Sequence, residues 1–246
     1  MGIIHSVKLK TKRYRTSSFI LFFLFLSASL CAQKPIYMEM HDDKPYYFGI
    51  TLSTLSGRLN TSMHPHFLEQ DTILTAEPLS SPGFALGLLA TMHLSNRFEG
   101  RFNPELQFTD RSIAYKLRYA DRELGSNVVQ KVESVIVTLP VQVKFNSDRI
   151  GNFRVYMLGG GKVDYDLASN AQARKAEDLI KLQKTDYGVE AGLGFNFYFQ
   201  SFIFSPEIKV SSGLSNIHAR DENLKYSSVL DRIQSRMIVF SIHLEG

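Results

Sequence analysis

Apolar and polar residues alternate along this chain with a period of two. The alternation is clearest at residues 187–200, where aromatic and aliphatic side chains hold the odd positions and Gly, Glu, Asn and Gln hold most of the even ones. Successive side chains of a β-strand point to opposite faces, so this pattern predicts a strand. Similar segments predict eight strands in all, at residues 46–56, 84–94, 98–108, 135–145, 153–165, 187–200, 202–211 and 236–245. We expect the glycine run 159–161 to house a bulge or a close backbone contact.

The connections between these strands are alternately long and short. The long ones are residues 57–82, a stretch that passes Tyr115 and returns near Lys131, residues 164–184, and residues 214–233; the short ones lie at 95–97, 147–151 and 200–201. Outer-membrane barrels have short periplasmic turns at one end and longer outside loops at the other. The chain is therefore predicted to be an all-β protein, an eight-stranded antiparallel up-and-down transmembrane β-barrel with long extracellular loops and short periplasmic turns.

The size of the side chains separates this prediction from a soluble secreted barrel or sandwich, which also alternates. The apolar rows carry repeated Phe, whereas the opposite rows carry Gly, Ser, Asn and charged residues. An eight-stranded barrel has an interior just wide enough for side chains, so rows of Phe fit better against lipid. We expect Phe195, Phe197 and Phe199 to face lipid, with Phe199 and the nearby Tyr198 in the aromatic girdle at the membrane interface.

The polar rows are expected to line the barrel interior. They carry charges of both signs, at Glu99, Arg101, Glu105, Lys144, Arg154, Glu190, Glu207 and Lys209. An unpaired charge in a narrow lumen costs several kcal/mol. Ion pairs that seal the lumen are therefore favoured over the alternative, a polar pathway for solute.

Residues 1–32 have the layout of a secretory signal peptide. Five basic residues and no acid precede the apolar run 19–26, and small residues follow it. A transmembrane anchor is the alternative, but the run is short and no stop-transfer flank follows. Cys31 raises a lipoprotein alternative, which the bulky Leu30 before it disfavours. We expect cleavage before Gln33.

Removal of this leader changes the charge of the protein. The full chain has 28 basic and 24 acidic residues, and the leader takes five of the basic ones with it, which leaves a mature charge of −1. The mature part, residues 33–246, forms the predicted barrel and has no cysteine. Disulfides, a thiol nucleophile and cysteine-bound metals are thereby excluded, and a nucleic-acid partner loses its main support.

No motif in the chain predicts catalysis, and no cofactor or metal site is expected. The sequence has no G-x-S-x-G, no H-E-x-x-H and no phosphate-binding glycine loop. His64 and His66 lie in a long loop, where we expect them to be ordinary solvated residues rather than a weak metal site. His93 and His243 fall on polar rows near strand ends, where a structural role is the default. A barrel enzyme acting on lipid would need a Ser or Asp beside a His near one membrane rim.

Five segments carry a resemblance to a known family. They are Tyr-Tyr-Phe-Gly at 46–49, Arg-Phe-Asn-Pro-Glu at 101–105, Asp-Leu-Ala-Ser-Asn at 166–170, the run at 204–217 that contains Ser-Pro-Glu-Ile-Lys and Leu-Ser-Asn-Ile, and the last strand at 235–245. With these segments the chain resembles the PorT family, also called SprT in gliding bacteria. The resemblance implies an outer-membrane β-barrel of Bacteroidetes that is required for type IX protein secretion, and for gliding where gliding occurs. It implies no catalytic residue.

The expected function is therefore a non-enzymatic part of a secretion machine, with outer-membrane lipid and other secretion proteins as partners. A passive small porin-like barrel without a role in secretion is the alternative. Residues 170–182 are predicted to form a short amphipathic helix in the third long loop. In the fourth, Arg220, Leu224 and Tyr226 are residues of the kind that anchor protein contacts, and we expect them to contribute to a partner surface. The chain ends in Gly246 rather than in an aromatic residue, in contrast to common outer-membrane barrels.

Overall fold

The computed structural model describes residues 35–65, 67, 73–121, 125–168, 182–219 and 226–246. In this part of the chain, ten antiparallel strands close into one barrel. The strands belong to the unit Tyr37–Gly246. They are β1 (Tyr46–Met63), β2 (Ile73–Leu79), β3 (Ser81–His93), β4 (Phe98–Phe102), β5 (Glu105–Asp121), β6 (Gly125–Asn146), β7 (Phe153–Asp166), β8 (Thr185–Tyr198), β9 (Ile203–Gly213) and β10 (Leu230–Glu245). A short 3₁₀ helix, η2 (Glu39–His41), precedes β1. Among these residues no helix is long and apolar enough to cross a membrane.

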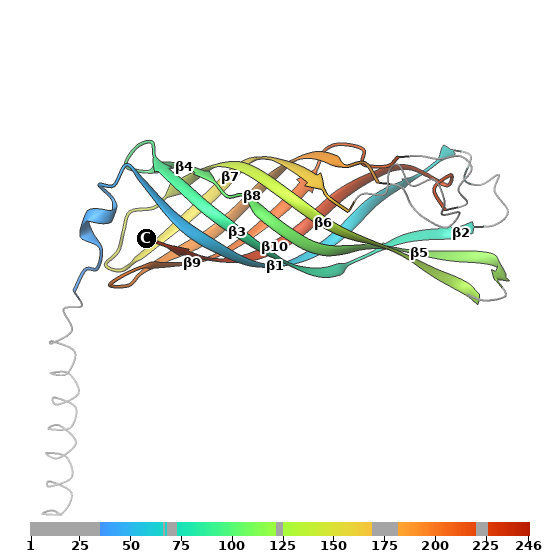
Figure 1. The fold of residues 1–246 in the computed structure, drawn as a ribbon, viewed down its shortest axis with the longest axis horizontal. Helices are drawn as coiled ribbons and strands as arrows, with labels where there is room; N and C mark the ends of the chain where they lie inside the picture. Colours follow the sequence, from blue (N-terminus) through green and yellow to red (C-terminus); the bar gives the residue numbers. More distant parts are fainter. Residues whose placement is uncertain (1–34, 66, 68–72, 122–124, 169–181, 220–225) are drawn as a thin grey trace, which may run out of the picture. The chain divides into compact units, whose positions relative to one another are not determined.

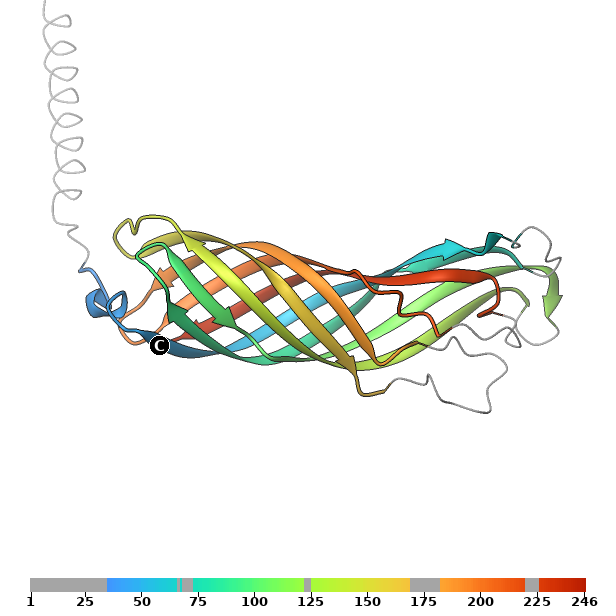
Figure 2. The ribbon, with the colours of Figure 1, turned by 90° about the horizontal axis from the view of Figure 1, so that it is seen from above.

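The barrel closes because β1 pairs with β10 on one side and with β3 on the other. All neighbouring strands are antiparallel and follow one another round the wall, so the predicted up-and-down topology is confirmed. The strands run obliquely round the barrel (Figure 2). The C-terminus lies at the same end as η2, and β2 lies at the opposite end (Figure 1).

The described residues form ten strands rather than the predicted eight because two of the paths round the barrel are each interrupted once: one within the predicted strand 98–108, the other at Ser80 in the predicted loop 57–82. Ser80 separates β2 from β3, and both of these strands pair with β5. Asn103 and Pro104 separate β4 from β5, and both pair with β3 and β6. Proline has no backbone N–H to donate to the ladder, which explains the second break. The ten strands therefore follow eight paths round the barrel.

Several strands are longer than the sequence pattern predicts. Residues 57–82 were expected to form a loop, but β1 continues to Met63 and β2 and β3 occupy Ile73–Leu79 and Ser81 onwards. Likewise β5 and β6 extend the second hairpin to Asp121 and Gly125, and β10 begins at Leu230. The three short turns lie where they were predicted, after β3, β6 and β8.

The glycine run in β7 contains a close backbone contact and no bulge. The pairing of β7 with β6 and β8 continues through residues 159–161 without a shift in register. A Cβ atom at Gly160 would collide with the carbonyl oxygen of Val141 on β6. The glycine therefore permits close packing of the two backbones.

The alternation places the apolar row of β8 outside, as predicted. Phe195, Phe197 and Phe199 are 42%, 38% and 46% exposed. Tyr198 is only 3% exposed, so its predicted place in the outer girdle is wrong. The period of two sends it into the barrel, between its outward neighbours.

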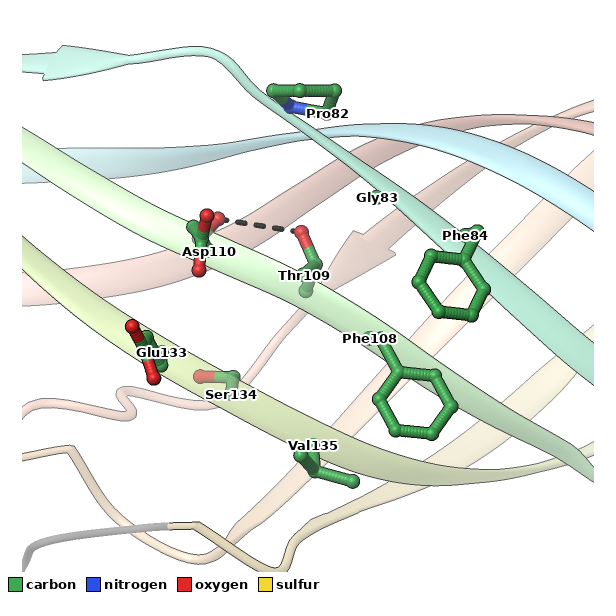
Figure 3. Close-up of a pocket in the computed structure, with 9 residues that line it drawn as sticks. All are labelled: Pro82, Gly83, Phe84, Phe108, Thr109, Asp110, Glu133, Ser134 and Val135. Carbon is green, nitrogen blue, oxygen red and sulfur yellow. Dashed lines mark hydrogen bonds between the residues drawn. The ribbon is translucent and has the colours of Figure 1, made fainter.

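The two faces of the wall exchange character toward the long-loop end. Over most of the barrel the outside is apolar and the inside is polar. At the long-loop end the inside is instead filled by a cluster of apolar side chains, called the apolar cluster below. Its members include Leu59, Ile73, Ile113, Tyr115, Leu117, Val128, Val132, Leu182, Ile217, Tyr226 and Ile233. On the outside, Phe108 is followed by Asp110 on β5, and Val135 is preceded by Glu133 on β6, as Figure 3 shows. The barrel thus has an apolar outer band that ends at a definite level.

Candidate functional site: the charged interior of the barrel

The interior of the banded part of the barrel is filled by charged and polar side chains from nearly every strand. All eight of the predicted polar-row charges are buried, with exposed fractions of 8% or less. Each of them lies one residue from an outward apolar side chain, so the strand period alone positions it. The charges form three groups along the axis and one group at the short-turn end.

The first group is centred on Arg101 of β4. Its guanidinium donates from Nη1 to Oε2 of Glu207 at 2.8 Å and from Nη2 to Oε1 of Glu245 at 3.3 Å. The Tyr156 hydroxyl donates to the same oxygen of Glu207 at 2.8 Å, and His243 Nε2 lies 3.3 Å from it. The side chains of the two ion pairs are at most 1% exposed. They therefore interact in a low dielectric and hold one another in place.

The second group is centred on Glu99, also on β4. Its carboxylate accepts from Lys144 Nζ at 3.2 Å and from the Tyr47 hydroxyl at 2.9 Å, and His93 Nε2 lies 3.1 Å away. Lys144 also lies over the ring of Tyr156, with Nζ 4.2 Å from the centroid. This cation–π contact links the second group to the first.

The third group is centred on Lys209 of β9. Its Nζ lies 3.1 Å from Glu105 Oε1 and 3.8 Å from Glu190 Oε2. Gln142 donates to Glu190, and Asn103 donates to Glu105 at 2.6 Å. The interruption of the strand at Asn103 therefore supplies a side chain to the network.

Further toward the long-loop end, a smaller acidic layer continues the polar interior. Lys162 Nζ lies 2.6 Å from Asp164, and Arg111 lies 4.0 Å from Asp166. Asp164 faces Asp186 across the β7–β8 pair, and Asp186 accepts from Ser235. Beyond this layer the interior becomes apolar.

The short-turn end is covered by the segment that contains η2. Asp42 accepts two hydrogen bonds from Arg154, at 3.0 and 2.9 Å, and this pairing anchors the segment to β7. Arg149 stacks on the inward ring of Tyr198, 3.7 Å from its centroid. His41 packs its ring against Tyr47 at 4.5 Å, and burial lowers the pKa of His41 to about 4, so that it is neutral at physiological pH.

This arrangement pairs most of the charges of the polar rows with one another. Among the described residues no group of three His, Cys, Asp or Glu side chains is arranged to hold a metal ion. One Ser–His contact occurs near the long-loop end, between Ser227 Oγ and His218 Nε2 at 2.9 Å. Ser227 is 0% exposed and His218 4%, so neither is accessible to a substrate. His93 and His243 belong to the ionic groups, as structural histidines do.

The predicted partner residues of the fourth long loop are placed only in part. Arg220 and Leu224 lie outside the described residues, as does the predicted helix except for Leu182, which forms a bridge with His218. The Tyr226 side chain is 2% exposed and packs on Tyr115 with ring centroids 4.8 Å apart. Its ring therefore belongs to the apolar cluster and is not available as a surface anchor. Periodicity along the chain does not reveal this burial, because the cluster is built from strands that are distant in sequence.

Comparison with known protein families identifies the class of barrel. Residues 43–219 match the family described as "Outer membrane protein beta-barrel domain". The chain belongs to this family. The apolar band of this outer-membrane barrel is thus the part that faces lipid, and its charged interior is a lumen within the outer membrane.

Solved structures similar to this outer-membrane barrel include two outer-membrane proteins and one bacterial surface protein. OprG from Pseudomonas aeruginosa has 13% identity and a TM-score of 0.48, with 81% of this chain and 93% of that chain covered. Neisserial surface protein A has 10% identity and a TM-score of 0.39, with 80% and 95% covered. The outer membrane protease OmpT from Escherichia coli has 7% identity and a TM-score of 0.38, with 81% and 95% covered. None of the curated proteins compared with the chain matches it in sequence.

Proposed function

We propose that this outer-membrane barrel is a non-enzymatic component of a type IX protein secretion machine, and that it acts through its surfaces rather than through its lumen. The observation that carries the proposal is the network of ion pairs that fills the lumen. The resemblance to the PorT family, noted above from the sequence, supplies the particular machine.

Several residues of the segments that carry this resemblance take part in the network. Glu207 and Lys209 come from the Ser-Pro-Glu-Ile-Lys run, and His243 and Glu245 come from the last strand. Arg101, Asn103 and Glu105 come from the segment at 101–105. Several residues of the segments that carry the resemblance thus line the interior, which supports the proposal.

A porin-like role is disfavoured by the same network. A solute pathway needs a continuous wet space, whereas Arg101 and Lys209 each reach across the lumen to carboxylates on strands that are not their neighbours. Lys144 adds a buried ion pair with Glu99 on the neighbouring strand. Eight strand paths leave room for little more than these side chains. Opening a path would separate buried ion pairs, which costs several kcal/mol for each.

An enzymatic role is disfavoured because the Ser–His contact near the long-loop end is buried. The Ser227–His218 pair resembles part of a hydrolytic site, but it is buried beside Ile217 and Val229 in the apolar end of the barrel. A nucleophile there has no route to lipid or peptide.

The elongated outer end of the barrel suits a partner surface. β5 and β6 continue well beyond the apolar band, and the apolar cluster inside them stabilises this extension as a folded outer domain. We propose that secretion partners bind here, with Arg220 and Leu224 in the surface.

The decisive experiment is a clean deletion of the gene in its own bacterium, with the fate of secreted cargo measured. We expect cargo to accumulate in the periplasm and to return to the medium when the intact gene is restored. The amount of an unrelated outer-membrane barrel, measured in the same cells, controls for a general envelope defect. Normal cargo release in the deletion strain would refute the proposal.

The surface part of the proposal is tested by changing Arg220 and Leu224 together to Ala. We expect normal barrel insertion, lost secretion and loss of the proteins that co-purify with the unchanged barrel after gentle solubilisation. Retained secretion with normal insertion would remove the loop from the partner surface.

A further inference from the structure

Two arginines face each other on the outer wall at the upper limit of the apolar band. Arg58 of β1 is the direct partner of Arg236 in the antiparallel register with β10, and both side chains are exposed on the outside. The next outward pairs toward the membrane are Ser56 with Ile238 and Thr54 with Phe240. The arginine pair therefore lies at the level where the lipid tails end and the headgroups begin.

The pair is unfavourable as it stands. Directly opposite residues of an antiparallel pair have Cβ atoms roughly 4.5–5.5 Å apart, and like charges at this separation destabilise the sheet. Neither guanidinium forms an ion pair with a carboxylate among the described residues. By contrast, the exposed Lys131 on β6 is paired with Asp110 at 2.9 Å.

The two arginines border a cleft that contains only neutral and basic groups. The cleft, of about 420 Å³, opens between β1, β10 and the interruption of the wall at Ser80. Hydrogen-bond donors are available there from Ser56, Asn60 and Ser80. No acidic residue lines it, whereas the groove on the far side of β3, of about 310 Å³, is lined by Asp110 and Glu133 (Figure 3).

We infer that this cleft binds a phosphate group on the headgroup of an outer-leaflet lipid. A phosphate between two guanidinium groups accepts bidentate, charge-assisted hydrogen bonds from both and removes their mutual repulsion. Ile238 and Phe240 continue the same outward row toward the membrane and present an apolar surface to the acyl chains of that lipid. A lipid thus satisfies both halves of the surface, which a free anion does not. The site is independent of any role in secretion.

The test uses the full mature barrel in detergent, with native mass spectrometry to count bound lipid. The probes are lipid A with its phosphates, enzymatically dephosphorylated lipid A, and inorganic phosphate. We expect phosphorylated lipid A to bind at least tenfold more tightly than the dephosphorylated form, and inorganic phosphate at equal concentration not to displace it. Equal binding of the two lipids, or displacement by inorganic phosphate, would overturn the inference.

Substitution locates the site. In the double variant R58Q/R236Q we expect at least a tenfold loss of binding of phosphorylated lipid A. The matched control K116Q/K184Q also removes two exposed positive charges from the long-loop end and should bind within twofold of the unchanged protein. Heat-dependent migration in gel electrophoresis verifies that each variant is folded. An equal loss in both double variants would show a general charge effect and would overturn the assignment to Arg58 and Arg236. If R58Q/R236Q does not fold, the comparison of the three probes on the unchanged protein decides the inference.

Discussion

At the scale of single residues, an outward apolar side chain stabilises the barrel by its contact with lipid. The size of this contribution to the free energy of unfolding depends on the depth of the side chain in the membrane. Leu193 lies at the centre of the outward row of β8, and Phe199 lies at its end beside the short turn. We expect Leu193→Arg to reduce the free energy of unfolding by about 2–4 kcal/mol and Phe199→Arg by about 0–1 kcal/mol. Phe195→Arg should fall between them. Urea unfolding of the barrel in lipid vesicles measures the series, and equal costs at all three positions would contradict the assigned depths.

An inward charge behaves differently, because its partners remain buried when it is removed. Arg101→Met leaves Glu207 and Glu245 without their shared cation, and we expect a loss of about 3–5 kcal/mol in the free energy of unfolding. The double variant R101M/E207Q should recover part of this loss, since one stranded charge is then neutral. Urea unfolding of both variants, of E207Q alone and of the unchanged protein gives the coupling between the two residues.

Arg97→Met is the matched control for this prediction. Arg97 pairs with Asp148 at 3.1 Å, but the two side chains are 57% and 80% exposed. Exposed ion pairs contribute little, so this variant should unfold almost as the unchanged protein does. A similar loss at both arginines would mean that the lumen is as well hydrated as the surface.

At the scale of elements, the alternation predicted the faces of most strands and the three short turns, but it failed where the environment reverses. In residues 57–63 the outward positions are Arg58, Asn60 and Ser62, and Leu59 points inward. This segment has too few apolar residues for a lipid-facing strand, so it resembled a loop. It is a strand because its inward side packs in the apolar cluster, which is assembled from strands that are distant in sequence.

The sequence pattern predicted which charged residues line the interior, but it did not predict which of them pair with one another. The eight polar-row charges were assigned to the interior from periodicity alone, and all are buried. Which carboxylate meets which cation depends on the tilt and register of strands on opposite sides of the lumen. Arg101 and Glu245, for example, are 144 residues apart. Tyr47 and Tyr156 stood in no charged pattern, yet they complete the network through their hydroxyl groups.

The apolar cluster gives a prediction for the outer extension as a unit. Tyr226→Ala removes a ring that packs on Tyr115, and deletion of a buried aromatic side chain costs about 3–5 kcal/mol. We expect the loss to appear locally, as faster hydrogen exchange in the outer half of β5, while the membrane-embedded half of the barrel keeps its protection. Equal protection in the variant and the unchanged protein would contradict a cooperative outer cluster.

At the scale of the whole molecule, the barrel combines two kinds of folded interior in one wall. Within the membrane, lipid solvates the outside and ion pairs fill the inside. Beyond the band, water solvates the outside and aliphatic and aromatic side chains fill the inside. The same eight strand paths serve both parts, because a residue's facing depends only on its position in the strand and not on its polarity. The rim between the two parts is where the Arg58–Arg236 pair lies.

The filled lumen leads to a prediction about conductance. In a planar lipid bilayer we expect the unchanged barrel to give no stepwise ionic current, since every strand path contributes side chains to the seal. Replacing Arg101, Lys144 and Lys209 together by Ser shortens three long side chains and leaves a set of buried carboxylates, at Glu99, Glu105, Glu190, Glu207 and Glu245. We expect this variant, where electrophoresis shows it to be folded, to conduct with a preference for cations, because rings of carboxylates favour cations in a pore. Stable current steps from the unchanged barrel would refute the sealed lumen, and with it the argument that the protein acts through its surfaces.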